Sequence, residues 1–317
     1  MEIHENIALR ERNWFRTGGP AEYYCEPQNS ADFSRALTFA LEKNFPLFFL
    51  GEGANILVSD AGFPGLVVHP NNTDIKILSE DRDEVLIRAG SGVSMQTLID
   101  YCLERNCIGL EDFSGIPGTV GGAVYINLHY FEYLLADFFD RGTVIDKKTG
   151  EIEEKDLDWF RFGYDESRLH DDEHYLIDAT FRLRRVSETE SAYARGRRDE
   201  IIRHRDRRYP DSNTCGSFFR NFHPGEVTLT IDGEPMLYVA YYLDKLGVKG
   251  ALQVGGARIS SKHANMLVTN EVAKSEDVIK LARTMQRMVN EEYGIVPQPE
   301  CQLVGFDSYP LMQTEGE

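Results

Sequence analysis

The sequence feature that most constrains the fold is a glycine-rich segment in the first half of the chain, DFSGIPGTVGGAV at residues 112–124. Four glycines stand there with Pro117, a composition unsuited to the interior of an ordinary helix or strand. Two interpretations remain open. The segment is either a tight connection between elements of a sheet or a loop whose backbone N–H groups face a bound anion.

A second glycine-rich segment, LGEGANILVSD at residues 50–60, follows the apolar run 47–50 directly. Glycine allows a ligand to approach the backbone closely, because no Cβ atom intervenes. The spacing is neither that of a dinucleotide fingerprint nor that of a P-loop. Two such segments in one half of the chain predict loops on opposite sides of one diphosphate.

The rest of the first half alternates helical and extended patterns. Apolar residues recur at helical spacing in 31–43, and Ser94 is a candidate N-cap for a second helix at 95–103. A turn at 147–150 predicts a hairpin of strands 143–146 and 151–153. The other predicted strands are 47–50, 56–58, 66–68, 85–89 and 176–183. The chain up to about Arg185 is therefore predicted to be α+β.

A polar stretch at 186–194 leads into a basic one at 195–208, which contains seven arginines. The basic stretch is either a solvated helix face or, at its end, part of a diphosphate-binding wall. A lobe boundary is predicted between Arg185 and Tyr209. Beyond it, the patterns predict a helix at 237–246 ended by Gly247, a strand at 253–259, and a long helix at 275–293 ended by Gly294.

Composition excludes several classes of protein. A formal net charge of −18 argues against binding to nucleic acid or to an anionic membrane surface. The apolar runs are far shorter than the roughly 18 residues of a membrane span, and residues 1–10 do not resemble a secretory signal, so a cytoplasmic location is expected. The five cysteines form no Cys-x-x-Cys pair, which predicts reduced thiols and no metal site. A monomer or weak dimer is expected.

Six segments together resemble one known family, the UDP-N-acetylenolpyruvoylglucosamine reductases, also called UDP-N-acetylmuramate dehydrogenases. They occur in the order and spacing of that family and cover nearly the whole chain. They are NWFRTGGPAEYY at 13–24, LGEGANILVSD at 50–60, SGIPGTVGGA at 114–123, CGSFFRN at 215–221, SKHANMLV at 261–268 and PQPECQLVGF at 297–306.

The resemblance implies an α+β protein with a vanillyl-alcohol-oxidase/PCMH-type FAD-binding fold and a separate C-terminal α+β substrate-binding domain. The FAD-binding domain is expected at 1–200, in two lobes at about 1–70 and 71–200, and the substrate-binding domain at 201–317. FAD is expected between the two glycine-rich loops. The residues assigned to it are Gly51, Glu52, Gly53, Ala54, Asn55, Ile56, Ser114, Gly115, Ile116, Pro117, Gly118, Thr119, Gly121, Gly122 and Ala123.

The resemblance also implies an activity. NADPH would reduce the flavin, and the enolpyruvyl group of UDP-N-acetylglucosamine enolpyruvate would then be reduced to give UDP-N-acetylmuramate for peptidoglycan synthesis. Ser217 matches the family's proton donor and Glu300 its catalytic carboxylate, whereas without the resemblance they would be a loop serine and a surface carboxylate. The residues expected to bind the UDP-sugar are Tyr164, Arg220, Asn221, Lys262, His263 and Asn265.

The chain departs from the family pattern at two places. Asp165 follows Tyr164 where the family commonly has an arginine that contacts the substrate carboxylate. Arg168 is the expected substitute, because a guanidinium pairs well with a carboxylate; a slipped alignment and an altered active site are the alternatives. The second departure is LHYFEYLLADFF at 128–139, where bulky residues replace a small-residue stretch and predict either altered packing or a changed pocket.

Two other functions compete with the reductase. One is a flavin oxidase or dehydrogenase of the same fold with a different substrate, although no histidine lies in either glycine-rich loop to tether FAD. The other is a flavin-binding or UDP-sugar-binding protein that lost catalysis through Asp165. The presence of Ser217 and Glu300 argues against this second alternative.

Overall fold

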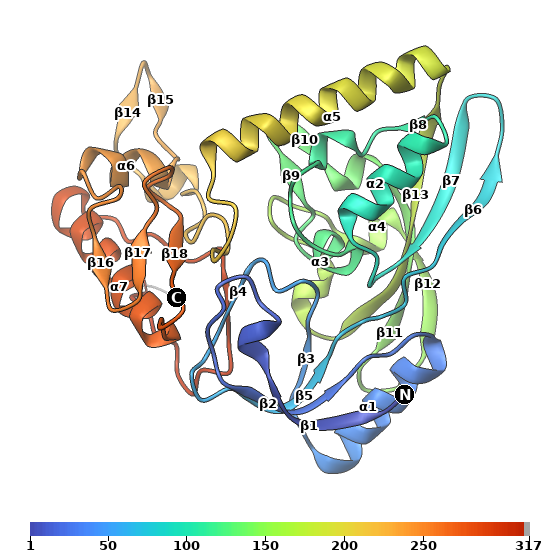
Figure 1. The fold of residues 1–317 in the computed structure, drawn as a ribbon, viewed down its shortest axis with the longest axis horizontal. Coiled ribbons are helices and arrows are strands. Elements are labelled where there is room, and N and C mark those ends of the chain that lie inside the picture. Colours follow the sequence, from blue (N-terminus) through green and yellow to red (C-terminus); the bar gives the residue numbers. More distant parts are fainter. Residues whose placement is uncertain (314–317) are drawn as a thin grey trace. The chain divides into compact units, whose positions relative to one another are not determined.

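A computed structural model describes residues 1–313 of the chain, which fold into two units (Figure 1). The first unit consists of Met1–Glu5, Tyr23–Glu52 and Gly65–Arg205; the second consists of Asn6–Glu22, Gly53–Pro64 and the chain from Asp206 onward. Two early segments thus belong with the C-terminal half. The reason is hydrophobic: Phe15 and Leu57 are fully buried in the core of the second unit.

A four-stranded sheet and helix α1 form one hydrophobic core of the first unit. The strand order is β1 (Ile3–Ala8), β2 (Pro20–Cys25), β5 (Phe63–Val68) and β3 (Leu47–Phe49), with β3 and β5 parallel. The predicted first helix is confirmed as α1 (Ser30–Lys43). Its N-cap Asn29 accepts the N–H of Asp32 at 3.1 Å, and it ends at Asn44, which is left-handed at φ 53°. The capped helix packs Phe33 and Leu37 into this core.

An antiparallel sheet forms the larger core of the first unit. Its order is β12 (Ile152–Asp156), β11 (Phe139–Asp146), β13 (His174–Arg185), β7 (Glu84–Gly90) and β6 (Ile75–Glu80), and β8 (Cys107–Ile108) also pairs with β13. The predicted hairpin is confirmed as β11–β12. Helix α2 (Met95–Glu104) contributes to this core and begins at Ser94, whose hydroxyl accepts the N–H of Thr97 at 3.1 Å.

The first unit also holds short elements. These are 3-10 helices η2 (Glu111–Phe113), η3 (Leu135–Asp137) and η4 (Arg168–Asp171), helices α3 (Val120–Tyr125) and α4 (Leu157–Phe160), and the hairpin β9 (His129–Tyr130)–β10 (Tyr133–Leu134). Helix α3 was not expected in a glycine-rich segment. It forms because Thr119 is its N-cap and accepts the N–H of Gly122 at 3.3 Å, so that two glycines lie in the first turn.

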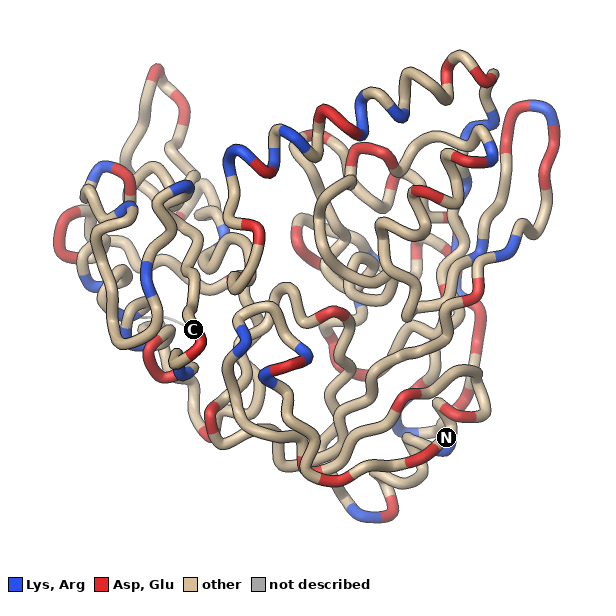
Figure 2. The backbone as a smooth tube through the Cα atoms, viewed as in Figure 1, with Lys and Arg blue, Asp and Glu red and all other residues tan. Residues whose placement is uncertain are grey.

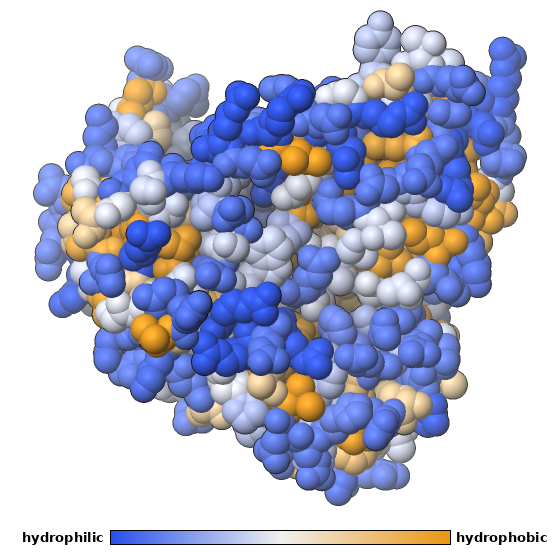
Figure 3. Space-filling view, viewed as in Figure 1, coloured by the Kyte–Doolittle hydropathy of each residue, from blue (hydrophilic) through white to orange (hydrophobic). Residues whose placement is uncertain are grey.

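Helix α5 (Glu188–Arg208) includes both the polar and the basic stretch, so residues 188–194 are helical and not a linker. Only Ser191 and Ala194 are buried along it. Figure 2 shows alternating charges along α5, and Figure 3 shows mostly hydrophilic side chains on its exposed side. The solvated helix face is therefore the interpretation that fits most of α5. Within residues 1–313, no helix is both long and apolar enough to cross a membrane.

The second unit packs helices α6 (Val239–Lys245) and α7 (Ser275–Tyr293) with a three-stranded antiparallel sheet of β16 (Gln253–Val254), β17 (Ala257–Ile259) and β18 (Leu267–Thr269). The predicted single strand at 253–259 was wrong, because Gly255, at φ 52°, turns the chain into a hairpin. The predicted end of α7 at Gly294 is confirmed. The remaining elements are η1 (Leu9–Glu11), β4 (Ile56–Val58), η5 (Pro224–Glu226), β14 (Thr230–Ile231), β15 (Glu234–Pro235) and β19 (Gln302–Val304).

All five cysteines are buried and free, which confirms the expectation of reduced thiols. Burial raises the pKa of Cys25 to about 12 and that of Cys102 above its usual range. The thiolate is the reactive form of cysteine, so these side chains act as apolar packing groups.

His263 couples the stability of the second unit to pH. Burial, assisted by the charge of Arg208, lowers its pKa from 6.5 to about 4. Between these values the unfolded chain binds a proton that the folded chain does not, so this contribution to stability is complete above pH 6.5 and is lost as the pH falls towards 4. The loss is at most about 3 kcal/mol.

We therefore expect His263→Gln to flatten the pH dependence of unfolding. Urea denaturation at pH 7 and at pH 4.5 should show the wild-type free energy of unfolding falling by roughly 2 kcal/mol more than that of the variant. Parallel curves for the two proteins would mean that His263 is protonated equally well in the folded chain.

Candidate functional site

The two glycine-rich loops meet within the first unit at Gly51 and Glu52. A Cβ atom on Gly51 would lie 2.7 Å from the Thr119 hydroxyl oxygen, so only glycine fits there. The Glu52 carboxylate accepts the backbone N–H of Gly118 at 2.9 Å. Burial raises the pKa of Glu52, and the Gly118 N–H opposes this shift. The structure thus places the start of the first loop directly against the second.

The second loop does not present a row of unused amides. The N–H of Gly121 bonds to Ser91 O at 2.9 Å and that of Val120 to Val93 O at 2.8 Å. Gln96 holds the start of the loop, because its amide oxygen accepts the Gly115 N–H at 3.1 Å and its amide nitrogen donates to Ile116 O at 3.2 Å. Most N–H groups of this loop are therefore already bonded within the protein. What the loop offers a ligand is a backbone that the ligand can approach closely.

Arg205 of α5 fixes the same loop from another side. Its Nε donates to the Gly115 carbonyl at 3.0 Å. A Cβ atom on Gly115 would lie 3.1 Å from Cδ of Arg205. The first loop differs: the described hydrogen bonds of residues 1–313 include none donated by the backbone N–H of Gly51, Glu52 or Ala54. Amide donors for an anion are therefore provided by the first loop.

Two buried polar atoms are consistent with a ligand at these loops. The Ser114 hydroxyl is fully buried and has no hydrogen-bond partner among residues 1–313, and neither has the Asn55 side-chain oxygen. A buried polar atom without a partner is costly. Gly118 is at φ 146° with nothing within 4 Å of its Cβ position. Within the first unit, the second loop thus has a buried hydroxyl without a partner at Ser114 and open space at Gly118, which fits a polar cofactor such as FAD.

Ser217 and Glu300 lie on neighbouring backbone segments of the second unit. The Glu300 N–H bonds to Phe218 O at 2.9 Å, one residue after Ser217, and Ser217 itself pairs with Met266. Phe218 is fully buried, whereas Ser217 and Glu300 are partly exposed. The structure therefore places the predicted proton donor and the predicted carboxylate on hydrogen-bonded backbone segments of the second unit.

Asn265 connects the segments that carry these residues. Its amide nitrogen donates to Phe219 O at 2.7 Å and its amide oxygen accepts the Phe219 N–H at 3.1 Å. The Asn265 backbone oxygen also accepts the Phe218 N–H at 2.8 Å. Since both polar atoms of the buried amide are bonded to the Phe219 backbone, Asn265 holds its own segment against the segment that carries Ser217. Asn55 joins the same region through Gln302, whose N–H bonds to Asn55 O at 3.0 Å.

The cations proposed for the UDP-sugar have partners within the protein. Arg220 forms a two-pronged pair with Glu226, at 2.8 and 2.7 Å, and also bonds to Asn221 O. Lys262 Nζ donates to Asp206 O and Tyr209 O at 2.7 and 3.0 Å. Lys262 therefore satisfies carbonyls at and just beyond the end of α5, where the sequence suggested a diphosphate wall.

Arg168 of the first unit lies over an aromatic ring. Its guanidinium is 4.7 Å from the centre of the Trp159 ring, and its Nε is 3.9 Å from the Asp171 carboxylate. Tyr164 is 55% exposed and its ring lies 4.5 Å from that of His129. These contacts give no support to Arg168 as the cation that replaces the family arginine, and that role stays a prediction.

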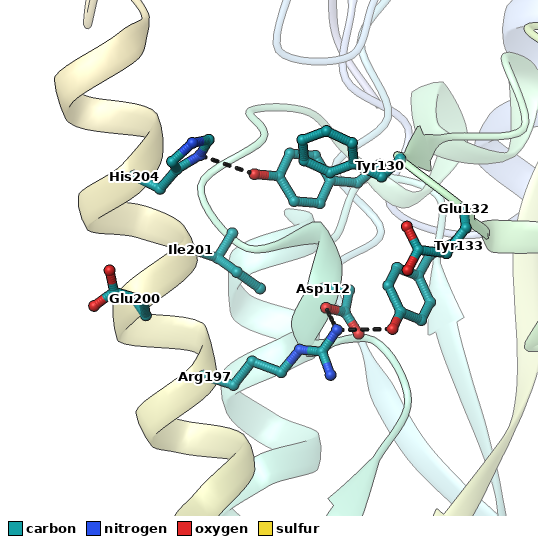
Figure 4. Close-up of a pocket in the computed structure, with 9 residues that line it drawn as sticks. Asp112, Tyr130, Glu132, Tyr133, Arg197, Glu200, Ile201 and His204 are labelled. Atoms are coloured by element: carbon teal, nitrogen blue, oxygen red, sulfur yellow. Dashed lines mark hydrogen bonds and ion pairs between the residues drawn. The ribbon is translucent and has the colours of Figure 1, made fainter.

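A cavity of about 300 Å³ lies between α5 and the β9–β10 hairpin (Figure 4). Arg197 spans it, bonded to the Asp112 carboxylate and to the Tyr133 hydroxyl, each at 2.8 Å. Burial raises the pKa of Asp112, against the opposing charge of Arg197. The Tyr130 hydroxyl lies 3.4 Å from His204 Nδ1. These contacts attach the hairpin to the helix.

Sequence reasoning did not single out Gln96, Asn127 or His129. Asn127 is buried, and its side chain joins Gly163 O at 2.8 Å to the Ala136 N–H at 3.0 Å. Such roles depend on contacts between segments distant in sequence, which no local pattern marks. For His129 one signal existed, since it lies within the departure at 128–139.

Comparison with known proteins agrees with this geometry. A family profile described as the C-terminal domain of UDP-N-acetylenolpyruvoylglucosamine reductase matches residues 208–304, and one described as an FAD-binding domain matches residues 21–155. The reductase of Thermus caldophilus has a crystal structure with a TM-score of 0.75 at 25% identity, covering 96% of this chain and 99% of that one. These matches confirm the predicted FAD-binding domain and the separate C-terminal domain.

Two relatives carry the same description. The UDP-N-acetylenolpyruvoylglucosamine reductase of Caldicellulosiruptor bescii is 32% identical, covering 98% of this chain and 93% of its own length. That of a Synechocystis strain is 33% identical, covering 96% of this chain and 91% of its own length. With this identity over almost its whole length, the chain belongs to the UDP-N-acetylenolpyruvoylglucosamine reductase family.

Proposed function

We propose that this chain is an FAD-dependent, NADPH-oxidising reductase that converts UDP-N-acetylglucosamine enolpyruvate into UDP-N-acetylmuramate for peptidoglycan synthesis. The observation that supports the proposal is that the segments carrying Ser217 and Glu300 are hydrogen-bonded to each other in the second unit. Family membership favours the reductase over an oxidase with another substrate and over a protein without catalysis.

The two glycine-rich loops would hold the cofactor. Gly51, Glu52 and Ala54 would offer backbone N–H groups to its diphosphate, and Ser114 and Asn55 would use the polar atoms that lack a protein partner. Gly118 would allow close approach, because no side chain fills the space beside it. When bound, FAD accepts a hydride from NADPH and supplies it to the substrate.

The remaining chemistry falls to residues of the second unit. Addition of hydride to one carbon of the enolpyruvyl double bond leaves negative charge towards the substrate carboxyl, and the neighbouring carbon must gain a proton. Ser217 would donate that proton from its hydroxyl. A hydroxyl is a weak acid, so the carboxyl group of Glu300, on the adjacent segment, would help to hold and return the proton.

The residues predicted to bind the UDP-sugar differ in their exposure and in their present contacts. Tyr164 is exposed, whereas Asn265 is buried and fully engaged. Arg220 and Lys262 could meet a ligand only while keeping or exchanging their present partners. The monomeric or weakly dimeric state and the cytoplasmic location stay predictions.

One anaerobic spectroscopic experiment tests the function. The purified holoenzyme should be yellow, NADPH should bleach it, and UDP-N-acetylglucosamine enolpyruvate should restore the oxidised spectrum. Bleaching by NADPH with no recovery on addition of the enolpyruvyl sugar would exclude the reductase function and leave a flavoprotein with another oxidant.

Ser217→Ala should separate the two half-reactions. We expect an unchanged rate of flavin reduction by NADPH and a reoxidation by substrate slowed by about 10²- to 10⁴-fold, because a general acid contributes that much. Stopped-flow absorbance measures both rates. Ser212→Ala is the matched control, since this serine is exposed and its hydroxyl donates to the carboxylate of neighbouring Asp211. Equal reoxidation rates in the two variants would show that Ser217 is not the donor.

Ser114→Ala should weaken FAD binding without destabilising the flavin-free chain, because the buried hydroxyl has no protein partner to lose. Loss of one hydrogen bond to FAD should raise its dissociation constant by roughly 3- to 10-fold, measured by flavin fluorescence during reconstitution. Ser167→Ala is the contrasting variant: its hydroxyl donates to Tyr125 O at 2.6 Å, so it should lower thermal stability. A destabilised Ser114→Ala apoprotein with normal FAD affinity would contradict the assignment.

A further inference from the structure

In the second unit, the segment that carries Ser217 continues into a loop that an ion pair closes. Both terminal nitrogens of Arg220 donate to the Glu226 carboxylate, at 2.8 and 2.7 Å. The same carboxylate accepts the backbone N–H of His223 at 2.6 Å, and the Glu226 N–H bonds to His223 O at 2.9 Å. Guanidinium and carboxylate groups in this two-pronged geometry form strong and well-oriented hydrogen bonds. The pair therefore fixes the shape of the loop 220–226.

The pair is shielded in part from water, and both of its members are charged at neutral pH. The side chains of Arg220 and Glu226 are 23% and 28% exposed. The hydrogen bonds from Arg220 hold the pKa of the Glu226 carboxyl below its usual range, against the opposing effect of burial. An ion pair of this geometry orders its surroundings better than a single contact between two flexible, exposed side chains.

A third hydrogen bond connects the pair to the backbone of Asn221. One terminal nitrogen of Arg220 donates to Asn221 O at 3.0 Å. The backbone on either side is held as well, since the Arg220 N–H bonds to Gln298 O at 3.0 Å and the Phe222 N–H bonds to Leu237 O at 2.9 Å. The Phe222 side chain is buried in the core of the second unit. The backbone of Asn221 is thus fixed before, at and after the residue.

The side-chain amide of Asn221, by contrast, is not used within the protein. It is half-buried, and the hydrogen bonds of residues 1–313 include none that it makes. Asn265 differs, because both polar atoms of its amide are bonded to backbone. An amide offers two donors and one acceptor. On a fixed backbone four residues after Ser217, the amide of Asn221 is ready for a polar ligand without further ordering.

We propose that Glu226, which lies outside the six family motifs, is a positioning residue for the UDP-sugar. Through Arg220 it holds the Asn221 backbone, so that the Asn221 amide meets the ligand in one orientation. Arg220 then acts on its neighbour in the chain and not on the ligand. This inference deepens the reductase function proposed above and rests on it.

The test compares Glu226→Gln with the wild type as holoenzymes. Glutamine keeps the size of the side chain but replaces one carboxylate oxygen by a donor, so the two-pronged pair is lost. KM for UDP-N-acetylglucosamine enolpyruvate should rise by roughly 3- to 10-fold, the effect of about one hydrogen bond, with kcat little changed and the rate of flavin reduction by NADPH unaltered. Arg220→Gln should raise KM equally, and the double variant should be no worse than either single one, because the two residues act as a unit.

Glu276→Gln is the matched control. Glu276 pairs with Lys280 at 2.7 Å on α7, and both side chains are more than half exposed. The substitution removes the same charge from an ion pair of the same unit, so KM should stay at the wild-type value.

The sign of the change in KM separates this role from the alternative in which Arg220 leaves Glu226 to bind the ligand. In that case Glu226→Gln would release the cation and lower KM. A lowered KM overturns the inference, and so does a double variant clearly worse than both single ones. An unchanged KM with reduced thermal stability would leave the pair as a structural tie and overturns it too.

Equilibrium binding of the enolpyruvyl sugar to the oxidised holoenzyme, followed by the change in flavin absorbance, distinguishes failure of this inference from failure of the reductase function. Weaker binding by Glu226→Gln, with normal binding by Glu276→Gln, supports the inference even where the wild type shows no turnover, and then only the reductase function fails. Equal binding by wild type and Glu226→Gln in an enzyme that turns over overturns the inference alone.

Discussion

The close approach of Gly51 to Thr119 is the constraint on which the rest of the cofactor site depends. A Cβ at Gly51 would collide with the Thr119 hydroxyl oxygen, and the same hydroxyl caps the helix that begins at Val120. Because Gly51 has no side chain, the first loop can pack against Thr119, which belongs to the second loop and caps α3. The Glu52 contact with Gly118 then fixes the two loops against each other.

The two loops differ in how their polar groups are bonded, and the difference suits a bound cofactor. The second loop uses its amides internally, through Ser91, Val93 and Gln96. Among the described residues of these loops, the buried side-chain atoms without a hydrogen-bond partner are those of Ser114 and Asn55. Because leaving a buried polar atom without a partner costs roughly 1–3 kcal/mol, such atoms are expected where a ligand completes the hydrogen bonding.

Local sequence patterns predicted the regular elements well and the contacts poorly. Helix α1 follows from apolar spacing, and α2 and α7 also from the caps at Ser94 and Gly294, because these signals lie within a few residues of one another. The hairpin at 253–259 and the helical turn at Val120 were missed, since glycine there marks a turn in one case and a capped helix start in the other. The six motifs identified Ser217 and Glu300, but no motif could show that Arg220 and Lys262 already have partners, which are set by residues far along the chain or outside the motif.

The departure at Asp165 is best understood together with the one at 128–139. A lone aspartate beside Tyr164 would oppose an anionic ligand, and a lone histidine in a hairpin would be unremarkable. The Asp165 carboxylate lies 3.0 Å from His129 Nδ1, so the two departures are in contact with each other. Tyr130 and Tyr133, which follow His129, are hydrogen-bonded to His204 and Arg197 of α5. Two of the bulky residues of the second departure thus attach the hairpin to α5. Altered packing and a changed pocket, the alternatives that the sequence offered for residues 128–139, stay predictions.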